Sequence, residues 1–321
     1  MTAGGTAVQH LRAALVAGAS WLACRLPEGL LIGLADAAGE LWYRLAPGRA
    51  ARGRRNLRRV CEWLAGEGLG PTAARAAAHD PAALERLLRS AFRHQARYYL
   101  EVALTPAVSP AYIRRRLVVE TPEVVDELLD RDGPLIIIGL HFGALELPAL
   151  YLADRTGRIP TAPMETIDDP PLQRWFERTR GSVGVRIVGL REARRELLAA
   201  LERGGIVGLV ADRDITGGGI PTPLFGHPAP LPAGPALLAL ESGAPTCVAA
   251  VRRTGRGRYR GRMERVELPA SGTRRERVTG FLAAEAAAFE RVVATAPDQW
   301  WAIFFPIWPD LEAPAHSPGE R

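Results

Sequence analysis

The chain has 321 residues, of which 47% are hydrophobic and 24% charged, so it can bury a sizeable core and is not a disordered protein. All 41 basic residues are arginine and the net charge is +6, which suits an anionic partner such as nucleic acid, a membrane surface or a phosphorylated substrate. Aromatic residues are only 7% of the chain and are not interleaved with the arginines, so the composition disfavours nucleic acid. The three cysteines are far apart and show no metal-ligand spacing, and we interpret them as buried apolar residues in a reducing compartment.

Residues 1–104 have the pattern of helices rich in alanine, leucine and arginine, with breaks at Pro27 and Pro47. Two apolar segments open this part, at 13–24 and 29–46. The first is too short to cross ~30 Å of hydrocarbon as a helix, and the second is interrupted by charged residues. We therefore expect apolar helices that lie on a bilayer and form a membrane-associating part of the chain. An ordinary packed helix and a spanning or signal segment are the alternatives.

The positive charge is concentrated in two runs of arginine, and the first of them contains no acidic residue. We expect the first run to reach the anionic headgroups of a membrane beside the apolar helices. The first run consists of Arg44, Arg49, Arg52, Arg54, Arg55, Arg58 and Arg59, and the second of Arg252, Arg253, Arg256, Arg258, Arg260, Arg262 and Arg265.

After residue 104 the pattern changes to short apolar runs that alternate with helical segments. This alternation predicts crossover units and a mostly parallel central sheet flanked by helices, so the fold class is α/β. The expected division is a helical N-terminal part, 1–104, and an α/β core, 105–321. Strands are expected at 135–140, 158–164, 185–190, 206–212, 246–253 and 259–268, and helices at 171–184, 191–205 and 232–245.

Titratable side chains follow two of the predicted strands. His141 comes directly after the strand 135–140, and Asp212, Arg213 and Asp214 follow the apolar run 206–210 of the next one. Ligands of open parallel sheets bind outside the carboxyl ends of the strands. If these two strands are parallel neighbours, the imidazole and the acidic triplet face one crevice.

Glu146 lies five residues after His141, within the predicted start of a helix. Five residues turn a helix by about 500°, which would leave the two side chains about 140° apart if both were helical. They can meet only if His141 lies in the turn before the helix, which Gly139 and Gly143 permit. Glu146 would then accept a hydrogen bond from one ring nitrogen and leave the other free as a base. The alternative is a histidine that caps the helix while Glu146 faces solvent.

The sequence lacks the usual motifs of a protein nucleophile or a nucleotide site. It contains no Gly-x-Ser-x-Gly elbow, no His-Glu-x-x-His, no P-loop and no Gly-x-Gly-x-x-Gly after a strand. A histidine and an acid without a protein nucleophile indicate that a substrate brings its own hydroxyl. His141 would deprotonate that hydroxyl so that it attacks an activated acyl carbon.

The segment "HFGALE", a histidine and an acid separated by four residues directly after an apolar strand, resembles the signature of the lysophospholipid acyltransferase superfamily. Further segments are similar to the branch that contains lipid A late acyltransferases and phosphatidylinositol mannoside acyltransferases. These further segments are "RRNLRRV", "LERGGIVGLVADRD", "PTPLFGHPAPLPAGPALLALESGAP" and "APDQWWAIFFPIW". The whole resemblance extends from about Leu11 to Pro309.

The resemblance implies roles for six residues. His141 is the general base, Glu146 is the acid of the motif, and Asp212 supports the histidine. Substrate contacts are implied for Arg213, Glu165 and Arg180. The segment "WWAIFFPIW" lacks the adjacent basic residues usual in the lipid A branch, which favours a different glycolipid acceptor.

The implied activity is transfer of a fatty acyl chain to a hydroxyl of a membrane glycolipid. The donor is a thioester, either acyl-CoA or acyl carrier protein, which is a co-substrate, so no cofactor and no metal are implied. The expected partners are therefore a membrane surface, the donor and the glycolipid. The expected location is the cytoplasmic face of the cell membrane, with the protein peripheral or monotopic.

Two other functions fit parts of the sequence. Asp212 and Asp214 form an Asp-x-Asp triplet at a strand end, which is how many glycosyltransferases hold a divalent metal. A membrane-associated glycosyltransferase is therefore the first alternative, and a metal requirement would favour it. A non-catalytic membrane-binding protein is the second, which loss of function only on deletion of the N-terminal helices would favour.

Overall fold

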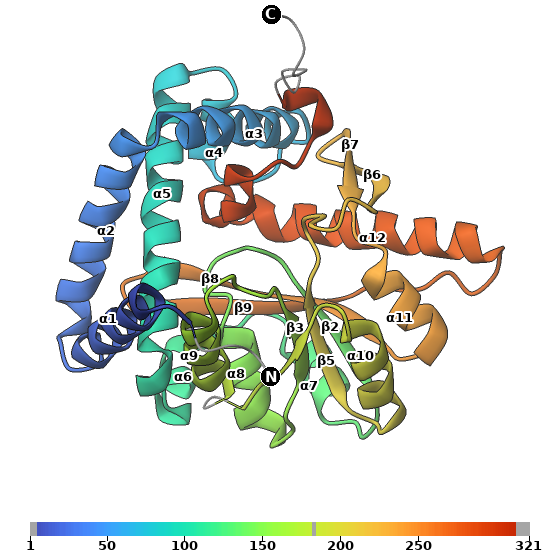
Figure 1. Cartoon of the computed structure of the whole chain (residues 1–321). Coiled ribbons are helices and arrows are strands. Elements are labelled where there is room, and N and C mark those ends of the chain that lie inside the picture. Colours follow the sequence, from blue (N-terminus) through green and yellow to red (C-terminus); the bar gives the residue numbers. More distant parts are fainter. Residues whose placement is uncertain (1–4, 182–183, 313–321) are drawn as a thin grey trace, which may run out of the picture.

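The computed structural model describes residues 5–181 and 184–312 and is an α/β structure, as predicted (Figure 1). Helices form the first third of the chain, and the predicted breaks at Pro27 and Pro47 separate the first three of them. The first helix begins with a capping box in which Thr6 and Gln9 satisfy each other's backbone N–H groups. These helices are α1 (Ala7–Ala23), α2 (Glu28–Leu45), α3 (Pro47–Gly66), α4 (Thr72–Ala77) and α5 (Pro81–Leu104).

Helices α1 and α2 expose large apolar side chains that nothing in the described part of the chain covers. The residues recur at helical spacing and so lie along one stripe of each helix. They are Val8, Leu11, Leu15 and Leu22 on α1, and Leu30, Leu34, Leu41 and Leu45 on α2. Within residues 5–181 and 184–312, none of the helices combines the length and the hydrophobicity needed to cross a membrane.

The central sheet has seven strands in the order β1-β9-β8-β2-β5-β3-β4. Strands β2, β3, β4, β5 and β8 run parallel, β9 pairs antiparallel with β8, and β1 pairs parallel with β9. The prediction of a mostly parallel sheet is therefore confirmed, although the short first strand was not predicted. The strands are β1 (Leu117–Val119), β2 (Leu135–Gly139), β3 (Thr161–Met164), β4 (Arg186–Gly189), β5 (Ile206–Val210), β8 (Thr246–Gly255) and β9 (Arg258–Arg265).

Helices cover both faces of this sheet, because successive side chains of a strand point to opposite faces. Ile136 and Val207 pack with α10 (Ala193–Glu202), α11 (Gly234–Ser242) and α12 (Arg274–Ala294) on one face. Their neighbours Leu135 and Ile206 pack on the other face with α7 (Pro122–Leu129) and α8 (Leu147–Thr156). Figure 1 shows the two sets of helices on opposite sides of the strands.

Three elements complete the described fold. They are α6 (Pro110–Arg116), α9 (Pro170–Gly181) and a hairpin of β6 (Ile220–Leu224) and β7 (His227–Leu231). Short 3₁₀ turns lie at Thr105–Ala107, Pro297–Gln299, Trp301–Phe304 and Pro309–Leu311. The helix predicted at 171–184 corresponds to α9, and its predicted residues 182–183 lie outside the described residues.

One hydrophobic cluster joins the N-terminal helices to the α/β part. It contains Leu57 and Phe92 from the helices, Ile138 from the sheet, and Trp300 and Trp308 from the closing segment, residues 296–308. Helix α5 ends at Leu104, where the sequence indicated a boundary. The division into parts 1–104 and 105–321 stays a prediction.

The arginines of the first run mostly contact the protein itself. Arg54 pairs with Glu85 at 2.8 Å on α5, Arg52 pairs with Glu312 at 3.0 Å, and the Arg55 side chain donates to the backbone carbonyl of Leu311. Arg59 pairs with Asp310. Two members, Arg44 and Arg58, have no such partner among the described residues. The run as a whole is therefore not the free cationic surface that the sequence indicated; it ties the C-terminal segment and α5 to α3.

The second run is used in the same way. Arg252 and Arg260 pair with Glu120, Arg265 pairs with Glu127, and Arg253 pairs with Glu101. The acids come from elements far away in the sequence, which is why the charge pattern alone did not show these pairs.

Candidate active site

His141 lies in the turn between β2 and α8, at the carboxyl end of its strand, and Asp212 follows β5. Strands β2 and β5 are parallel neighbours that pair from Leu135 with Ile206 to Gly139 with Val210. This pairing confirms that the two strand ends meet. The His141 Nδ1 atom is 2.6 Å from Oδ1 of Asp212, and the His141 backbone N–H donates to Oδ2 at 2.9 Å.

Three donors converge on the fully buried carboxylate of Asp212. Besides the two from His141, the Trp300 indole N–H donates to Oδ2 at 2.7 Å. Burial acts to raise the pKa of Asp212, but the attraction of His141 and the hydrogen bonds from His141 and Trp300 outweigh it, so the pKa lies below its usual range. The carboxylate is therefore ionised and accepts a hydrogen bond from the Nδ1–H group of His141. The lone pair of the imidazole ring is then on Nε2.

The closing aromatic segment holds the imidazole ring in place. Trp301 meets the His141 ring in an edge-to-face contact with centroids 4.5 Å apart, and its backbone N–H donates to the His141 carbonyl at 2.9 Å. Asn56 of α3 in turn donates to the carbonyls of Ile303 and Phe305 at 2.8 and 3.0 Å. The N-terminal helices thus reach the site through the segment that carries Trp300 and Trp301.

The turn after His141 depends on a glycine and a buried arginine. Gly143 has a φ of 53°, and a Cβ atom there would lie 2.0 Å from the Val251 carbonyl oxygen, so only glycine fits. Its own carbonyl accepts a hydrogen bond from Arg253 at 2.9 Å, and Glu101 balances the charge of that guanidinium. Sequence reasoning missed this support and that of Trp300, since each partner is distant in the chain.

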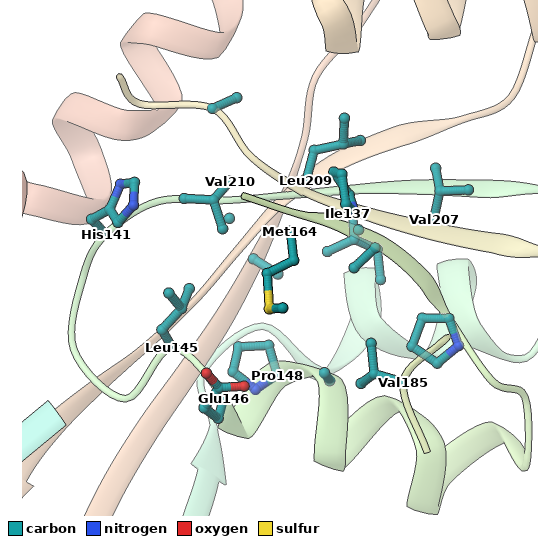
Figure 2. Close-up of a pocket in the computed structure, with 18 of the residues that line it drawn as sticks. Ile137, His141, Leu145, Glu146, Pro148, Met164, Val185, Val207, Leu209 and Val210 are labelled. Atoms are coloured by element: carbon teal, nitrogen blue, oxygen red, sulfur yellow. The ribbon is translucent and has the colours of Figure 1, made fainter. Parts of the chain in front are cut away.

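Glu146 does not contact His141 as expected. Its carboxylate accepts a hydrogen bond from Arg180 of α9 at 2.9 Å, and no hydrogen bond to the imidazole is formed in the described ranges. Figure 2 shows Leu145 between the two side chains. The expected contact fails because Asp212, one strand away, already holds Nδ1, while Glu146 lies at the start of α8 and faces α9.

A cavity of about 850 Å³ opens beside His141 and is lined mainly by apolar side chains (Figure 2). This volume falls in the range of ligand pockets. Glu146, Arg180, Arg213 and Glu165 also line it, so the cavity brings together the residues predicted to bind substrate.

The cavity passes through the sheet between β3 and β5. These strands pair only at Thr161 and Val207 and then part. Pro163, two residues further along β3, has no N–H to donate to a neighbouring strand. The consecutive residues Val207–Val210 all line the cavity, which therefore reaches both faces of β5. Lining residues also come from helices on both faces, Leu152 from α8 and Leu238 from α11.

Arg213 and Asp214 have different surroundings from Asp212. The Arg213 guanidinium lies over the Phe305 ring, 4.0 Å from its centroid, and 3.8 Å from the exposed carboxylate of Glu165. The Asp214 carboxylate accepts the backbone N–H groups of its own loop at Thr216, Gly217 and Gly219.

The two carboxylates of the triplet are therefore already engaged with separate donors. The Asp212 carboxylate accepts hydrogen bonds from His141 and Trp300, and the Asp214 carboxylate accepts them from the loop that follows it. Over the part of the chain that the structure describes, no three side chains of His, Cys, Asp or Glu are grouped as a metal site would require. The arrangement gives no support to the glycosyltransferase alternative.

An ionised carboxylate that orients a histidine, which itself lines an apolar cavity, is an arrangement suited to activate a hydroxyl next to a fatty chain. The chain is similar to a phosphatidylinositol mannoside acyltransferase of Mycobacterium tuberculosis strain H37Rv, 29% identical over 233 residues that cover 70% of this chain and 68% of that one. Another, of Mycolicibacterium smegmatis, is 30% identical over 162 residues, 49% of this chain and 53% of that one.

The protein is an acyltransferase. The model of the bacterial lipid A biosynthesis acyltransferase family matches residues 75–306, and the chain belongs to this family. The resemblance seen in the sequence is thereby confirmed.

Proposed function

We propose that this protein transfers a fatty acyl chain from an acyl thioester, acyl-CoA or acyl carrier protein, to a hydroxyl of a membrane glycolipid. The acceptor would be similar to a phosphatidylinositol mannoside or to lipid A, as the names of the relatives and of the family imply. The observation that carries the proposal is the His141–Asp212 pair, whose imidazole lines an apolar cavity.

The proposed reaction needs no covalent enzyme intermediate. His141 Nε2 takes the proton of the acceptor hydroxyl while the hydroxyl oxygen attacks the thioester carbonyl carbon. The tetrahedral intermediate then breaks its carbon–sulfur bond, and the imidazolium returns the proton to the leaving thiolate, which yields an ester and a thiol. Asp212 stabilises the imidazolium between the two steps. No metal and no cofactor enter this proposal.

The fatty chain of the donor would occupy the cavity. Each methylene group removed from water contributes about 0.8 kcal/mol, so the lining of the cavity can bind a long chain firmly. Glu146 and Arg180 form an ion pair at the cavity wall and would contact the sugar of the acceptor together with Glu165. A catalytic role for Glu146 stays a prediction.

The proposed place of action is the cytoplasmic face of the cell membrane, where acyl thioesters are made and the lipid acceptor is embedded. We propose that the exposed apolar stripe of α1 and α2 enters the headgroup region and brings the cavity mouth to the acceptor. The stripe takes this role in place of the first arginine run, whose members are mostly paired inside the protein.

The test is an acyl transfer assay with purified protein, glycolipid vesicles and both candidate donors, read by mass spectrometry of the lipid. Asp212→Asn should lower kcat by about 10²–10⁴, because the amide no longer stabilises the imidazolium. If the wild-type protein forms no ester with either donor, or if Asp212→Asn keeps full activity, the proposal is wrong.

A further inference from the structure

Two guanidinium groups share one aromatic ring, that of Phe305, which lines the cavity. Arg213, which follows β5, lies with its Cζ atom 4.0 Å from the Phe305 centroid, and Arg49 of α3 lies 5.1 Å from the same centroid. Arg49 also lies over Trp42 and Phe304, at 4.9 and 5.0 Å. Aromatic faces attract cations, so these rings hold both guanidinium groups in position.

Neither guanidinium group of this pair has a close, buried carboxylate to balance its charge. Arg49 donates to a neutral amide oxygen, Gln95 Oε1, at 3.2 Å. The carboxylate nearest to Arg213 is Glu165, at 3.8 Å and 57% exposed, where water screens it. By contrast, Arg54 on the same helix as Arg49 forms two hydrogen bonds with Glu85.

Arg49 and Arg213 also have N–H groups that donate no hydrogen bond to the described residues. The Nε atoms of Arg49 and Arg213 are both buried and lack a hydrogen-bond partner among the residues that the structure describes. Burial lowers the pKa of Arg49, and the like charges of Arg52 and Arg213 lower it further, against an opposite effect of Tyr99. The site thus holds excess positive charge and unused N–H groups, which a bound anion would satisfy.

The pair lies close to the reaction centre. Trp301 contacts the His141 ring at 4.5 Å, and Phe305 lies 6.5 Å from Trp301, so two ring contacts separate the base from the guanidinium groups. Arg213 and Phe305 line the same cavity as His141. An anion bound here would belong to a molecule that also reaches the catalytic histidine.

We infer that Arg49 and Arg213 form a clamp for a phosphate group carried by one of the two substrates, an inference that rests on the proposed function. The planar fork of arginine matches phosphate oxygens, and both guanidinium groups lie within 5.1 Å of the centroid of the same ring. The phosphate has two possible sources, the phosphopantetheine arm of the donor and the phosphodiester of the lipid acceptor. Both are tested below.

The kinetic test compares Arg49→Gln and Arg213→Gln with wild type. Arg58→Gln is the matched control, because Arg58 is an exposed arginine of the same helix. The donors are acyl-CoA and acyl-N-acetylcysteamine, which has the same thioester without phosphate. The acceptors are a phosphodiester glycolipid and an alkyl mannoside without phosphate. With both phosphates present, each clamp variant should lower kcat/KM roughly ten- to a hundredfold, mostly through KM.

The source of the phosphate is identified by the phosphate-free substrate with which the clamp variants no longer lose kcat/KM. If the loss disappears with acyl-N-acetylcysteamine, the clamp holds the donor; if it disappears with the alkyl mannoside, the clamp holds the acceptor. An equal loss with every pair of substrates would mean that the arginines only support the fold, and no loss would mean that they bind nothing. Either result overturns the inference.

Calorimetry separates a failure of the clamp from a failure of the proposed function. Wild-type protein should bind either 4′-phosphopantetheine or glycerophosphoinositol at least tenfold more tightly than the phosphate-free pantetheine or inositol, and Arg49→Gln should remove this difference. If wild type shows this preference but makes no ester, only the proposed reaction is wrong. If neither phosphorylated probe is preferred, the clamp is wrong whether or not the enzyme is active.

Discussion

Two buried carboxylates in this protein have opposite surroundings. Asp212 is ionised because three donors converge on it. Glu285 of α12 is equally buried, and neither of its oxygens has a partner within the described ranges. Burial and the charge of Asp212 raise the pKa of Glu285 well above its usual range. Glu285 therefore keeps its proton to a higher pH than an ordinary carboxyl does, whereas Asp212 is ionised.

The unpartnered Glu285 should cost stability. In the unfolded chain this carboxyl ionises above its ordinary pKa of 4.5, whereas in the folded protein it keeps its proton to a higher pH. The unfolded state thus binds fewer protons, so the free energy of unfolding falls as pH rises above about 4.5. Glu285→Met should raise the free energy of unfolding at pH 7 by about 1–3 kcal/mol and reduce its pH dependence, measured by urea denaturation at several pH values.

Glu290 of the same helix is the control for this prediction. Its carboxylate accepts a hydrogen bond from the Phe225 backbone N–H, so Glu290→Met should destabilise the protein. A Glu285→Met protein that is less stable than wild type at pH 7 would show that Glu285 has a stabilising partner.

At the scale of the elements, β5 decides the shape of the cavity. One edge of β5 pairs with β2 along five residue pairs. Beyond Val207, the other edge of β5 faces the cavity. Gly208 lies in this free stretch, and a Cβ atom at that position would meet no atom within 4 Å. A side chain there would extend into the cavity without displacing the protein.

Gly208→Leu should therefore shorten the acyl chain that the enzyme accepts while leaving the fold intact. Overpacking costs about 1–3 kcal/mol, so turnover of long acyl thioesters should fall about tenfold or more relative to short ones. The measurement is kcat/KM over a series of chain lengths, with Gly66→Leu, at the exposed end of α3, as the control. An unchanged chain-length profile would mean that the acyl chain does not pass β5.

Helices α1 and α2 are the second element with a proposed function, that of membrane binding. Replacing Leu11, Leu15, Leu34 and Leu41 with serine should weaken binding to both neutral and anionic vesicles by at least tenfold, measured by sedimentation. Full burial of a leucine side chain contributes about 1.5–3 kcal/mol, and each replacement removes part of this free energy of binding. Activity on a water-soluble acceptor should change little, since these side chains are exposed and lie outside the cavity lining.

Exposed apolar residues elsewhere serve as the control. The double variant Leu69→Ser and Ile159→Ser removes exposed apolar side chains outside the stripe and should bind vesicles like wild type. A four-serine variant that sediments as wild type does would place the membrane contact elsewhere in the molecule.

For the molecule as a whole, the parts that sequence could predict are those that depend on local pattern. The apolar run Leu135–Gly139 and the run Ile206–Val210 identify buried parallel strands, and polar residues directly after them identify the edge that carries the candidate site. The positions of His141 and Asp212 follow from this rule. Their contact depended only on the strands being neighbours.

The parts that sequence missed depend on partners far away in the chain. Arg180 comes from a different crossover unit than Glu146, and Trp300 comes from the closing segment, so neither contact has a local signal. The β6–β7 hairpin was missed because its prolines indicate a loop. Pro221 faces Pro230 and Pro223 faces Pro228, so each proline lies opposite another proline. The residue pairs between them contain no proline and can form the hydrogen bonds of the hairpin.

The central claim is that His141 acts as the general base of acyl transfer, and the most direct test is the turnover of His141→Ala. A positioned base contributes about 10²–10⁴ in rate, so kcat should fall by that factor while the melting temperature and vesicle binding stay as in wild type. Added imidazole should restore part of the activity, since a free base can enter the space that the ring leaves at the cavity mouth. A His141→Ala protein that keeps a tenth or more of wild-type turnover without imidazole would contradict the assignment.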